Sequence, residues 1–347
     1  MTTIYLIRHA EADGNLYRRA HGWYDSVITD RGYRQIAALA KRFASTHVDA
    51  VYSSDRRRTM TTALSVYKTH SLPLVTTPRV REIGIGVWED HPWAELERTD
   101  GEQLERFNTD AAHWHVAGGE HLPDVRERMI GALREIAEAH PNGTAAVFSH
   151  GMAIRLTVGT LQGLSLHEID GTGHAENTAV SCLEYENGAF RVVYRDDNSH
   201  LAERGLSTFA KQSWWKDKNM VESGEGYAML TDGERETLGV PAGGDGVAVR
   251  YGDALIGAFT LRDEGDALRL VWYGLAPEWR GRGLGIPPMG QAIDACLKRG
   301  RDALRLDCPD RTLRPFFARL GFVPTAGDTM EKDVRRVMPP LPPAYLG

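Results

Sequence analysis

Short apolar runs alternate with amphipathic stretches along the first 150 residues of the chain. The apolar runs are short enough to predict buried strands, and they lie at residues 5–7, 48–52, 74–77 and 145–148. Asp30–Phe43 places its apolar residues on one helical face, and Thr29 before it is a suitable N-terminal cap. Residues 56–69 and 125–140 follow the same helical pattern. Strands that alternate with helices predict an α/β fold.

The later part of the chain has a different pattern. Ser181–Tyr185 and Phe190–Tyr194 flank Asn187-Gly188, a dipeptide that favours a tight hairpin turn. Further along, the sequence predicts strands at 246–250, 255–261, 267–275 and 303–307, with a helix at 289–299. Residues 198–222 fit neither pattern, and we interpret them as a partly helical connector.

Length, charge and cysteine content narrow the class of protein. At 347 residues the chain is long enough for two domains, each with its own core. A net charge of -6 argues against a general nucleic-acid or membrane partner. The three cysteines are widely spaced and predict reduced thiols, and no segment approaches the roughly 18 apolar residues of a membrane span. We therefore expect a cytoplasmic protein and leave a homodimer open.

Polar residues suited to catalysis follow three of the predicted strands. Arg8-His9 ends the first, Ser149-His150-Gly151 follows another, and Arg58 lies at the helix start after the strand at 48–52. Open α/β folds bind their ligands at the carboxyl ends of such strands. Glu82 lies on a glycine-flanked loop, where the backbone can approach a ligand closely.

Together these motifs resemble the histidine phosphatase superfamily, also called the phosphoglycerate mutase-like fold, over about the first 200 residues. The resemblance implies that His9 is the residue that becomes phosphorylated and that Glu82 is the proton donor. It places the phosphate ligands at Arg8, Arg58 and His150. Other pocket positions of the family fall on Asn15, His21, Gly22 and Gly151. The usual Arg-His-Gly reads Arg8-His9-Ala10 here, and that third residue shapes the turn without taking part in the chemistry.

The chemistry also follows from the residue types. Two guanidinium forks and two imidazoles supply the charge and the donors that a phosphate monoester dianion needs. The same cations lower the pKa of His9, which keeps its imidazole neutral and nucleophilic at pH 7. Glu82 is placed to protonate the leaving alkoxide and then to take a proton from the hydrolysing water. Because arginines supply the charge, we expect a metal-independent phosphohydrolase of a small soluble phosphomonoester.

A second motif, Arg280-Gly281-Arg282-Gly283-Leu284-Gly285, follows the predicted strand that ends at Leu275. Successive glycines let backbone amides surround a pyrophosphate at a helix N-terminus. With Phe316–Phe322 further along, the hexapeptide resembles the GNAT acetyltransferases. The resemblance implies that acetyl-CoA is bound by these six residues and Leu275, and that an amine is the acyl acceptor.

Three departures from the GNAT pattern bear on catalysis. Phe317 stands where many members of the family have a tyrosine that protonates the coenzyme thiolate. Pro287-Pro288 remove donors from the first turn of the pyrophosphate helix. The usual first helices are compressed into residues 213–239. We expect coenzyme binding and leave acetyl transfer open.

Two other groups of residues have simpler explanations than ligand binding. No cysteine or carboxylate spacing accompanies His113, His115 and His121, so we interpret them as a polar wall and assign no metal. Trp214-Trp215 is interpreted as a contact between domains.

The sequence therefore predicts a phosphoglycerate mutase-like three-layer α/β/α domain over residues 1–205, followed by a GNAT-like α+β domain over 226–347. Residues 206–225 would connect them, and 92–120 would form a capping insert over the first site. Three rivals to the phosphohydrolase stay open. They are a phosphoglycerate mutase, a binding module with a vestigial pocket, and an N-acetyltransferase with an accessory phosphatase domain. A mutase usually has a longer insert than 92–120 can provide.

Overall fold

The computed structural model describes residues 1–202, 205–207 and 225–335. The strands of its first sheet are β1 (Thr2–Arg8), β2 (Ala50–Ser53), β3 (Leu74–Thr76), β4 (Thr144–Ser149), β5 (Val180–Glu186) and β6 (Ala189–Asp197). The accompanying helices are α1 (Asp13–Leu16), α2 (Asp30–Phe43), α3 (Arg57–Tyr67), α4 (Trp93–Thr99), α5 (Gly101–Thr109), α6 (Leu122–Ala139), α7 (Gly151–Leu161), α8 (Leu166–Asp170) and α9 (Ser199–Ala202). We call this part the first domain.

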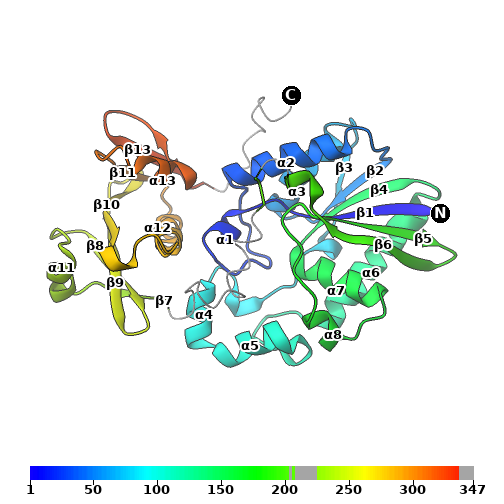
Figure 1. Cartoon of the computed structure of the whole chain (residues 1–347), viewed down its shortest axis with the longest axis horizontal. Helices are drawn as coiled ribbons and strands as arrows, with labels where there is room; N and C mark the ends of the chain where they lie inside the picture. Colours follow the sequence, from blue (N-terminus) through cyan, green and yellow to red (C-terminus); the bar gives the residue numbers. More distant parts are fainter. Residues whose placement is uncertain (203–204, 208–224, 336–347) are drawn as a thin grey trace.

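The first sheet has the strand order β3-β2-β4-β1-β5-β6. Its first four strands run parallel, and β5 and β6 form an antiparallel hairpin at the end of the sheet. Helices α2 and α3 cover one face, while α6 and α7 cover the other (Figure 1). The predicted three-layer α/β/α arrangement is therefore confirmed. Because β2, β4 and β1 are neighbours, the loops at their carboxyl ends meet at one edge.

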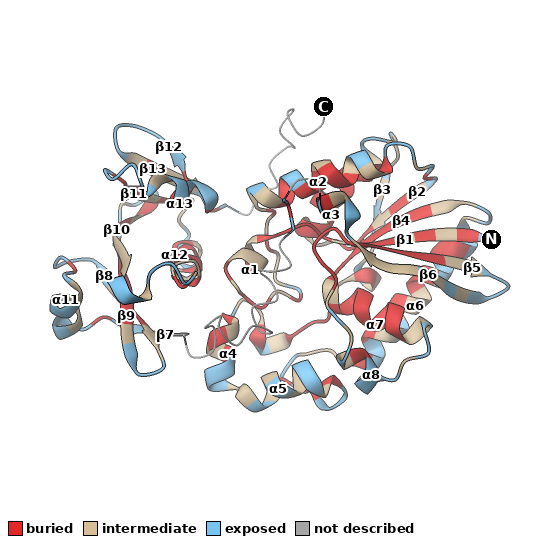
Figure 2. Ribbon diagram, viewed as in Figure 1, coloured by how far each residue is buried: buried red, intermediate tan, exposed pale blue. Residues whose placement is uncertain are grey.

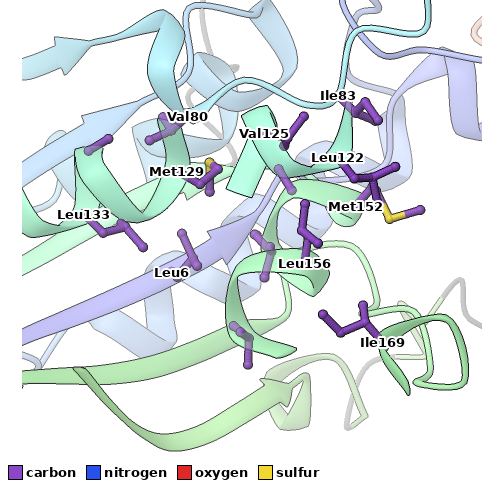
Figure 3. Packing of buried hydrophobic residues seen from close by; sticks show 14 of the residues in the cluster. Leu6, Val80, Ile83, Leu122, Val125, Met129, Leu133, Met152, Leu156 and Ile169 are labelled. Carbon is purple, nitrogen blue, oxygen red and sulfur yellow. The ribbon is translucent and has the colours of Figure 1, made fainter. Parts of the chain in front are cut away.

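The core of the first domain lies on both faces of β1. Leu6 points to one face, where it packs in a cluster with Met129 of α6 and Leu156 of α7 (Figure 3). Ile7 points to the opposite face, where it packs in a separate cluster with Leu39 of α2 and other apolar residues. This alternation is the period-two pattern of a strand covered on both sides. Buried and intermediate residues accordingly alternate along much of β1 and β2, and β4 is buried from Ala145 to Ser149 (Figure 2).

The region predicted as a capping insert contains α4, α5 and a short 3-10 turn. Its aromatic residues pack around the buried Trp88, whose ring lies 5.6 Å from that of Trp114 and 5.8 Å from that of Phe107. The indole N–H of Trp88 donates to Asp100 at 2.9 Å. Aromatic packing of this kind gives the segment a small apolar centre joined to the main core.

The second domain has a seven-stranded sheet of order β12-β13-β11-β10-β9-β8-β7. The strands are β7 (Glu225–Met229), β8 (Asp245–Tyr251), β9 (Ala254–Asp263), β10 (Ala267–Leu275), β11 (Ala303–Asp307), β12 (Val323–Pro324) and β13 (Thr329–Asp333), with helices α11 (Asp232–Leu238), α12 (Pro287–Lys298) and α13 (Arg314–Arg319). Only β10 and β11 pair in parallel, and α12 connects them. The predicted α+β domain is confirmed.

Several predicted boundaries were wrong by one to three residues. The helix predicted at 125–140 begins at Leu122, because Pro123 fits the first helical turn, where its missing N–H costs nothing. The helix predicted at 289–299 begins at Pro287 for the same reason. The helix predicted at 56–69 begins at Arg57, because Arg56 is extended. Strand β7 was not predicted.

Part of the predicted connector, together with Trp214-Trp215, lies outside the described residues. Within the described part of the chain, no helix is both long and apolar enough to cross a membrane.

Candidate active site

Three histidines meet at the carboxyl ends of the parallel strands. His9 follows β1, His150 follows β4, and His21 comes from the loop after α1. The ring centroid of His9 lies 5.4 Å from that of His150 and 5.6 Å from that of His21. The structure thus brings these predicted pocket residues together around His9.

Hydrogen bonds define the protonation of His9. Its Nδ1–H donates to the carbonyl oxygen of Ala10 at 2.8 Å, so the lone pair of the neutral ring is on Nε2. The side chain is only 2% exposed. The amide of Asn177 donates to the backbone carbonyl of His9 at 2.9 Å and holds the segment in place. His9 therefore presents an unprotonated nitrogen from a fixed backbone.

Burial and neighbouring cations keep His9 neutral. Burial is the largest cause that lowers its pKa well below 6.5, and the charges of Arg58 and Arg8 lower it further. The same two causes, burial first and then Arg58, lower the pKa values of His21 and His150. All three imidazoles are therefore neutral at pH 7, as the sequence predicted for His9.

Arg58 lies at the start of α3 and is fully buried. Its Nη2 donates to the carbonyls of His21 and Gly22 at 3.0 and 2.6 Å, and its Nη1 donates to the carbonyl of Tyr24 at 2.7 Å. Burial lowers its pKa to about 10, which still leaves the guanidinium charged at neutral pH. Arg58 thus anchors the segment of His21 while it places a positive charge beside His9.

The Nε–H of Arg8 is a buried donor without a hydrogen-bond partner among the described residues. Nη1 of the same side chain donates to the carbonyl of Ala175. Orphaned buried donors are costly, and they mark places where a ligand oxygen can bind. An ideal Cβ on Gly151 would lie 3.2 Å from this Nε, so glycine keeps the space beside it open.

Glu82 is held by the N-terminus of α7. Its carboxylate accepts from the backbone N–H groups of Met152 and Ala153 at 3.0 and 2.8 Å. Its charge reaches both Arg8 and Arg58, whose pKa values it raises against the effect of burial. Arg128 of α6 donates to the Glu82 carbonyl at 2.8 Å and fixes the loop from behind. Glu82 therefore has a defined position next to the arginines.

Two serines and an asparagine orient the remaining imidazoles. Nε2–H of His150 donates to Ser54 at 2.9 Å, because its Nδ1 accepts from Arg58 Nε at 3.2 Å. The amide of Asn15 donates to Nε2 of His21 at 3.0 Å, and Nδ1–H of His21 donates to Ser26, also at 3.0 Å. Both serines, like Asn177, were missed from the sequence, because an isolated serine or asparagine gives no signal of its pocket.

Gly22, another predicted pocket residue, lies against the backbone of Ile83, next to Glu82. An ideal Cβ there would approach the carbonyl oxygen of Ile83 to 2.3 Å, so no side chain fits. The segment of His21 can thus pack directly on the backbone of the Glu82 loop.

The predicted coenzyme loop follows Leu275 at the end of β10 and leads into α12. Gly281 and Gly283 have φ angles of +76° and +79°, which other residues rarely adopt. Arg280 Nε donates to the carbonyl of Leu275 at 2.9 Å, and the guanidinium of Arg282 lies 5.1 Å from the ring centroid of Trp279. Leu284 is buried and anchors the loop to the core.

The aromatic residues of α13 pack close to this loop. Phe317 lies in the core, with its ring centroid 6.3 Å from that of Tyr273, and it has no polar atom to offer a thiolate. The hydroxyl of Tyr273 donates to the carbonyl of Gly285, the last residue of the hexapeptide.

The histidines interpreted as a polar wall have partners of their own. His113 pairs with Asp110, and the ring of His115 stacks on that of His121 at 5.3 Å. Among the described residues, no three histidine, cysteine or acidic side chains are grouped as a metal site would require.

Comparison with known families agrees with this division. The model of the histidine phosphatase superfamily (branch 1) matches residues 4–198, and the model of the acetyltransferase (GNAT) family matches residues 209–322. The first match spans more than half of the chain. The protein therefore belongs to the histidine phosphatase superfamily, with a GNAT domain fused after it.

The similar proteins align with the first domain. Phosphoserine phosphatase 1 of Hydrogenobacter thermophilus is 30% identical over 203 residues, which are 58% of this chain and 96% of that protein. A probable phosphoglycerate mutase GpmB of Yersinia pestis is 31% identical over 206 residues, which are 58% of this chain and 95% of that protein. Among solved structures, Bacillus stearothermophilus YhfR superposes with a TM-score of 0.56 at 29% identity, covering 58% of this chain and all of that one.

Proposed function

We propose that the first domain hydrolyses small phosphomonoesters through a phosphohistidine at His9. The observation that carries the proposal is the buried, neutral His9, with Nε2 unprotonated and the charges of Arg8 and Arg58 beside it. Buried cations are costly unless something compensates them. A phosphate dianion is the ligand that would complement these two.

The proposed reaction has two displacements at phosphorus. His9 Nε2 attacks and the P–O bond to the alcohol breaks. Glu82 enters this step as the carboxylic acid, gives its proton to the departing oxygen and is left as the carboxylate. Water then attacks the phosphohistidine, Glu82 takes a proton from it, and the N–P bond breaks to release phosphate and neutral His9. Arg8 Nε supplies its unused donor to an equatorial oxygen, and Arg58 supplies charge. His150 would turn its Nε2–H from Ser54 to the phosphate.

A phosphoglycerate mutase is the second candidate for the first domain, because the similar proteins include both phosphatases and probable mutases. The two functions differ in where the phosphoryl group goes. A hydrolase transfers it to water, whereas a mutase returns it to another hydroxyl of the substrate.

A phosphate-release screen over sugar phosphates, nucleotides, phosphoserine and phosphoglycerates, run in a chelator, tests the hydrolase. We expect stoichiometric phosphate release, and acid-quenched enzyme should hold base-stable, acid-labile phosphate. Interconversion of phosphoglycerates with little free phosphate would establish the mutase instead. Activity that disappears in the chelator and returns with a divalent metal would contradict the metal-independent mechanism.

We further propose that the second domain binds acetyl-CoA at Leu275 and Arg280–Gly285. The match to the GNAT family supports it. The local geometry fits a diphosphate: an ideal Cβ on Gly281 would meet nothing within 4 Å, so the loop backbone is open to an approaching ligand. When bound, the coenzyme would supply an acyl thioester. Transfer to an amine is a further proposal, and Phe317 cannot donate a proton to the thiolate.

Calorimetry with acetyl-CoA tests coenzyme binding. We expect Gly283→Glu to abolish it, since a carboxylate would repel the diphosphate. Gly265→Glu is a matched control, because Gly265 also has a positive φ, +94°, and lies on the turn between β9 and β10. If the wild type does not bind, the second domain is a GNAT-shaped scaffold.

A further inference from the structure

One short segment of the first domain contacts both candidate sites. We call residues 13–21, which include α1, the bridging segment. Asn15 and His21 are bonded to each other in the phosphatase pocket. Tyr17, between them in sequence, belongs instead to the apolar core of the second domain. Figure 1 shows α1 facing α12 across the junction between the domains.

The contact at Tyr17 is closely fitted. The side chain is 3% exposed, and its hydroxyl donates to the carbonyl of Leu320 at 3.2 Å, next to the end of α13. An ideal Cβ on Gly290 of α12 would lie 2.7 Å from Cβ of Tyr17, so the helix can approach only because residue 290 is glycine. This fit indicates a built interface that positions the bridging segment on the second domain.

Arg19 attaches the same segment to α12. Its guanidinium lies 3.7 Å from the carboxylate of Asp294, and it also donates to Asp90 at 2.6 Å. The apolar contact at Gly290 and the charged contact at Asp294 therefore hold residue 18 close to α12.

Arg18 lies over the coenzyme loop. Its Nη2 is 3.6 Å from the position of an ideal Cβ on Gly283. Its backbone has a φ of +58°, an unusual conformation for arginine, and its carbonyl accepts from the N–H of Trp93 at 3.0 Å. The left-handed backbone and the bonded carbonyl fix where this side chain begins.

The chemistry of this placement is that of an anion site. Gly283 is at the centre of the glycines whose backbone would surround a diphosphate. The loop's own Arg280 is bonded to the carbonyl of Leu275, and Arg282 lies against Trp279. Arg18 brings a guanidinium of the first domain to within 3.6 Å of the ideal Cβ position on Gly283, and a guanidinium can bind two phosphate oxygens at once.

We propose that Arg18 of the first domain is a ligand of the coenzyme diphosphate, so that the coenzyme site of the second domain is completed by the phosphatase. The proposal rests on acetyl-CoA binding at residues 280–285. It assigns the bridging segment a role at both sites: Asn15 and His21 serve the phosphatase pocket, and Arg18 serves the coenzyme.

Calorimetry on the full chain tests the proposal with Arg18→Asn, since asparagine tolerates a positive φ but has no charge. We expect acetyl-CoA to bind about tenfold more weakly or worse, as for the loss of a charge-assisted hydrogen bond. Arg34→Asn is the matched control, because Arg34 is an exposed arginine of the same domain, and its affinity should stay within about twofold of the wild type. Arg18→Lys should recover part of the loss.

Two further measurements separate a ligand from a structural residue. The salt dependence of log Kd should be shallower for Arg18→Asn than for the wild type, because one phosphate contact is lost. The loss should persist with dephospho-CoA, which keeps the diphosphate and lacks the 3′-phosphate. Equal affinities of wild type and Arg18→Asn, or equal salt slopes, would overturn the role of Arg18 alone. A wild type that binds no acetyl-CoA would overturn coenzyme binding itself.

Discussion

The two candidate sites are built in opposite ways. The pocket of the first domain consists of buried side chains, with Arg58 and His150 fully enclosed and neutral imidazoles held among cations. The loop of the second domain consists of backbone at an accessible turn, where Gly281 has open space around it. Burying charge is expensive, whereas a glycine turn costs little. The buried charges of the first domain therefore give strong physical support for a bound anion. The glycine loop of the second domain allows a ligand to bind but does not by itself require one.

The difference extends to the reactive groups. Each step proposed for the phosphatase has a side chain in position: Nε2 of His9 for attack, Glu82 for the proton and Arg8 Nε for the oxygen. In the second domain, the family resemblance implies a proton donor at Phe317, and phenylalanine has no proton to give. The comparison predicts that substitutions in the first site abolish chemistry, while those in the second change binding.

The largest expected effect is that of His9→Ala on phosphate release. Loss of the nucleophile should lower kcat by at least about 10³-fold, as for other residues that form the covalent intermediate. Acid-quenched variant should contain no phosphohistidine, and circular dichroism should show a folded protein. His47→Ala is the control, because this exposed histidine precedes β2, at the opposite end of the strand from the pocket. Unchanged turnover in a folded His9→Ala protein would contradict the phosphohistidine mechanism.

Glu82→Gln should have the next largest effect, and it should depend on the leaving group. Loss of a general acid typically costs about 10²-fold to 10⁴-fold where the leaving group needs the proton. Alkyl phosphates should therefore slow far more than aryl phosphates, whose leaving groups are stable as anions. The amide of glutamine can still accept from Met152 or Ala153, so the loop should stay in place. Equal losses of rate with alkyl and aryl phosphates would mean that Glu82 has a structural role and is not the general acid.

The acid titration of His9 should show a smaller but diagnostic effect. Its lowered pKa means that the folded protein favours the neutral ring, so the imidazole should not protonate as pH falls from 7.5 to 5.5. An ordinary histidine would become about nine-tenths protonated over that range. The stabilisation linked to the neutral ring is present above pH 6.5 and is lost as pH falls below it. NMR titration of the His9 ring checks this, and a midpoint near 6.5 would contradict it.

Local patterns explain which parts of the molecule were predictable. Helix α2 was predicted with its observed bounds, because Thr29 accepts a hydrogen bond from Gly32 and its apolar residues share one face. Strand β10 was predicted just as well from its pattern. His9, Arg58 and His150 could be named in advance because each follows a strand, where parallel folds collect ligand-binding residues, whereas His21 was named from the family resemblance.

Long-range contacts explain what was not predictable. The hydroxyl of Tyr17 bonds to a carbonyl 303 positions further along the chain, and no local pattern relates the two. Ser54, Ser26 and Asn177 become recognisable only once the imidazoles that they orient have been placed. Strand β7 is only five residues long and gains its identity by pairing with β8. Tertiary context determined each of these features.

The smallest expected effect concerns the junction between the two regions. Tyr17→Phe removes the hydroxyl that donates to Leu320 and keeps the ring that packs on Gly290, so it should destabilise the second domain by about 1 kcal/mol. Hydrogen exchange at α12 and α13 would measure the loss. Tyr67→Phe is the control, because no hydrogen bond of the Tyr67 hydroxyl is described within residues 1–202, 205–207 and 225–335. If protection from hydrogen exchange fell only in the first domain, the second domain would be stable without the Tyr17 hydroxyl. The two sites would then act as separate units.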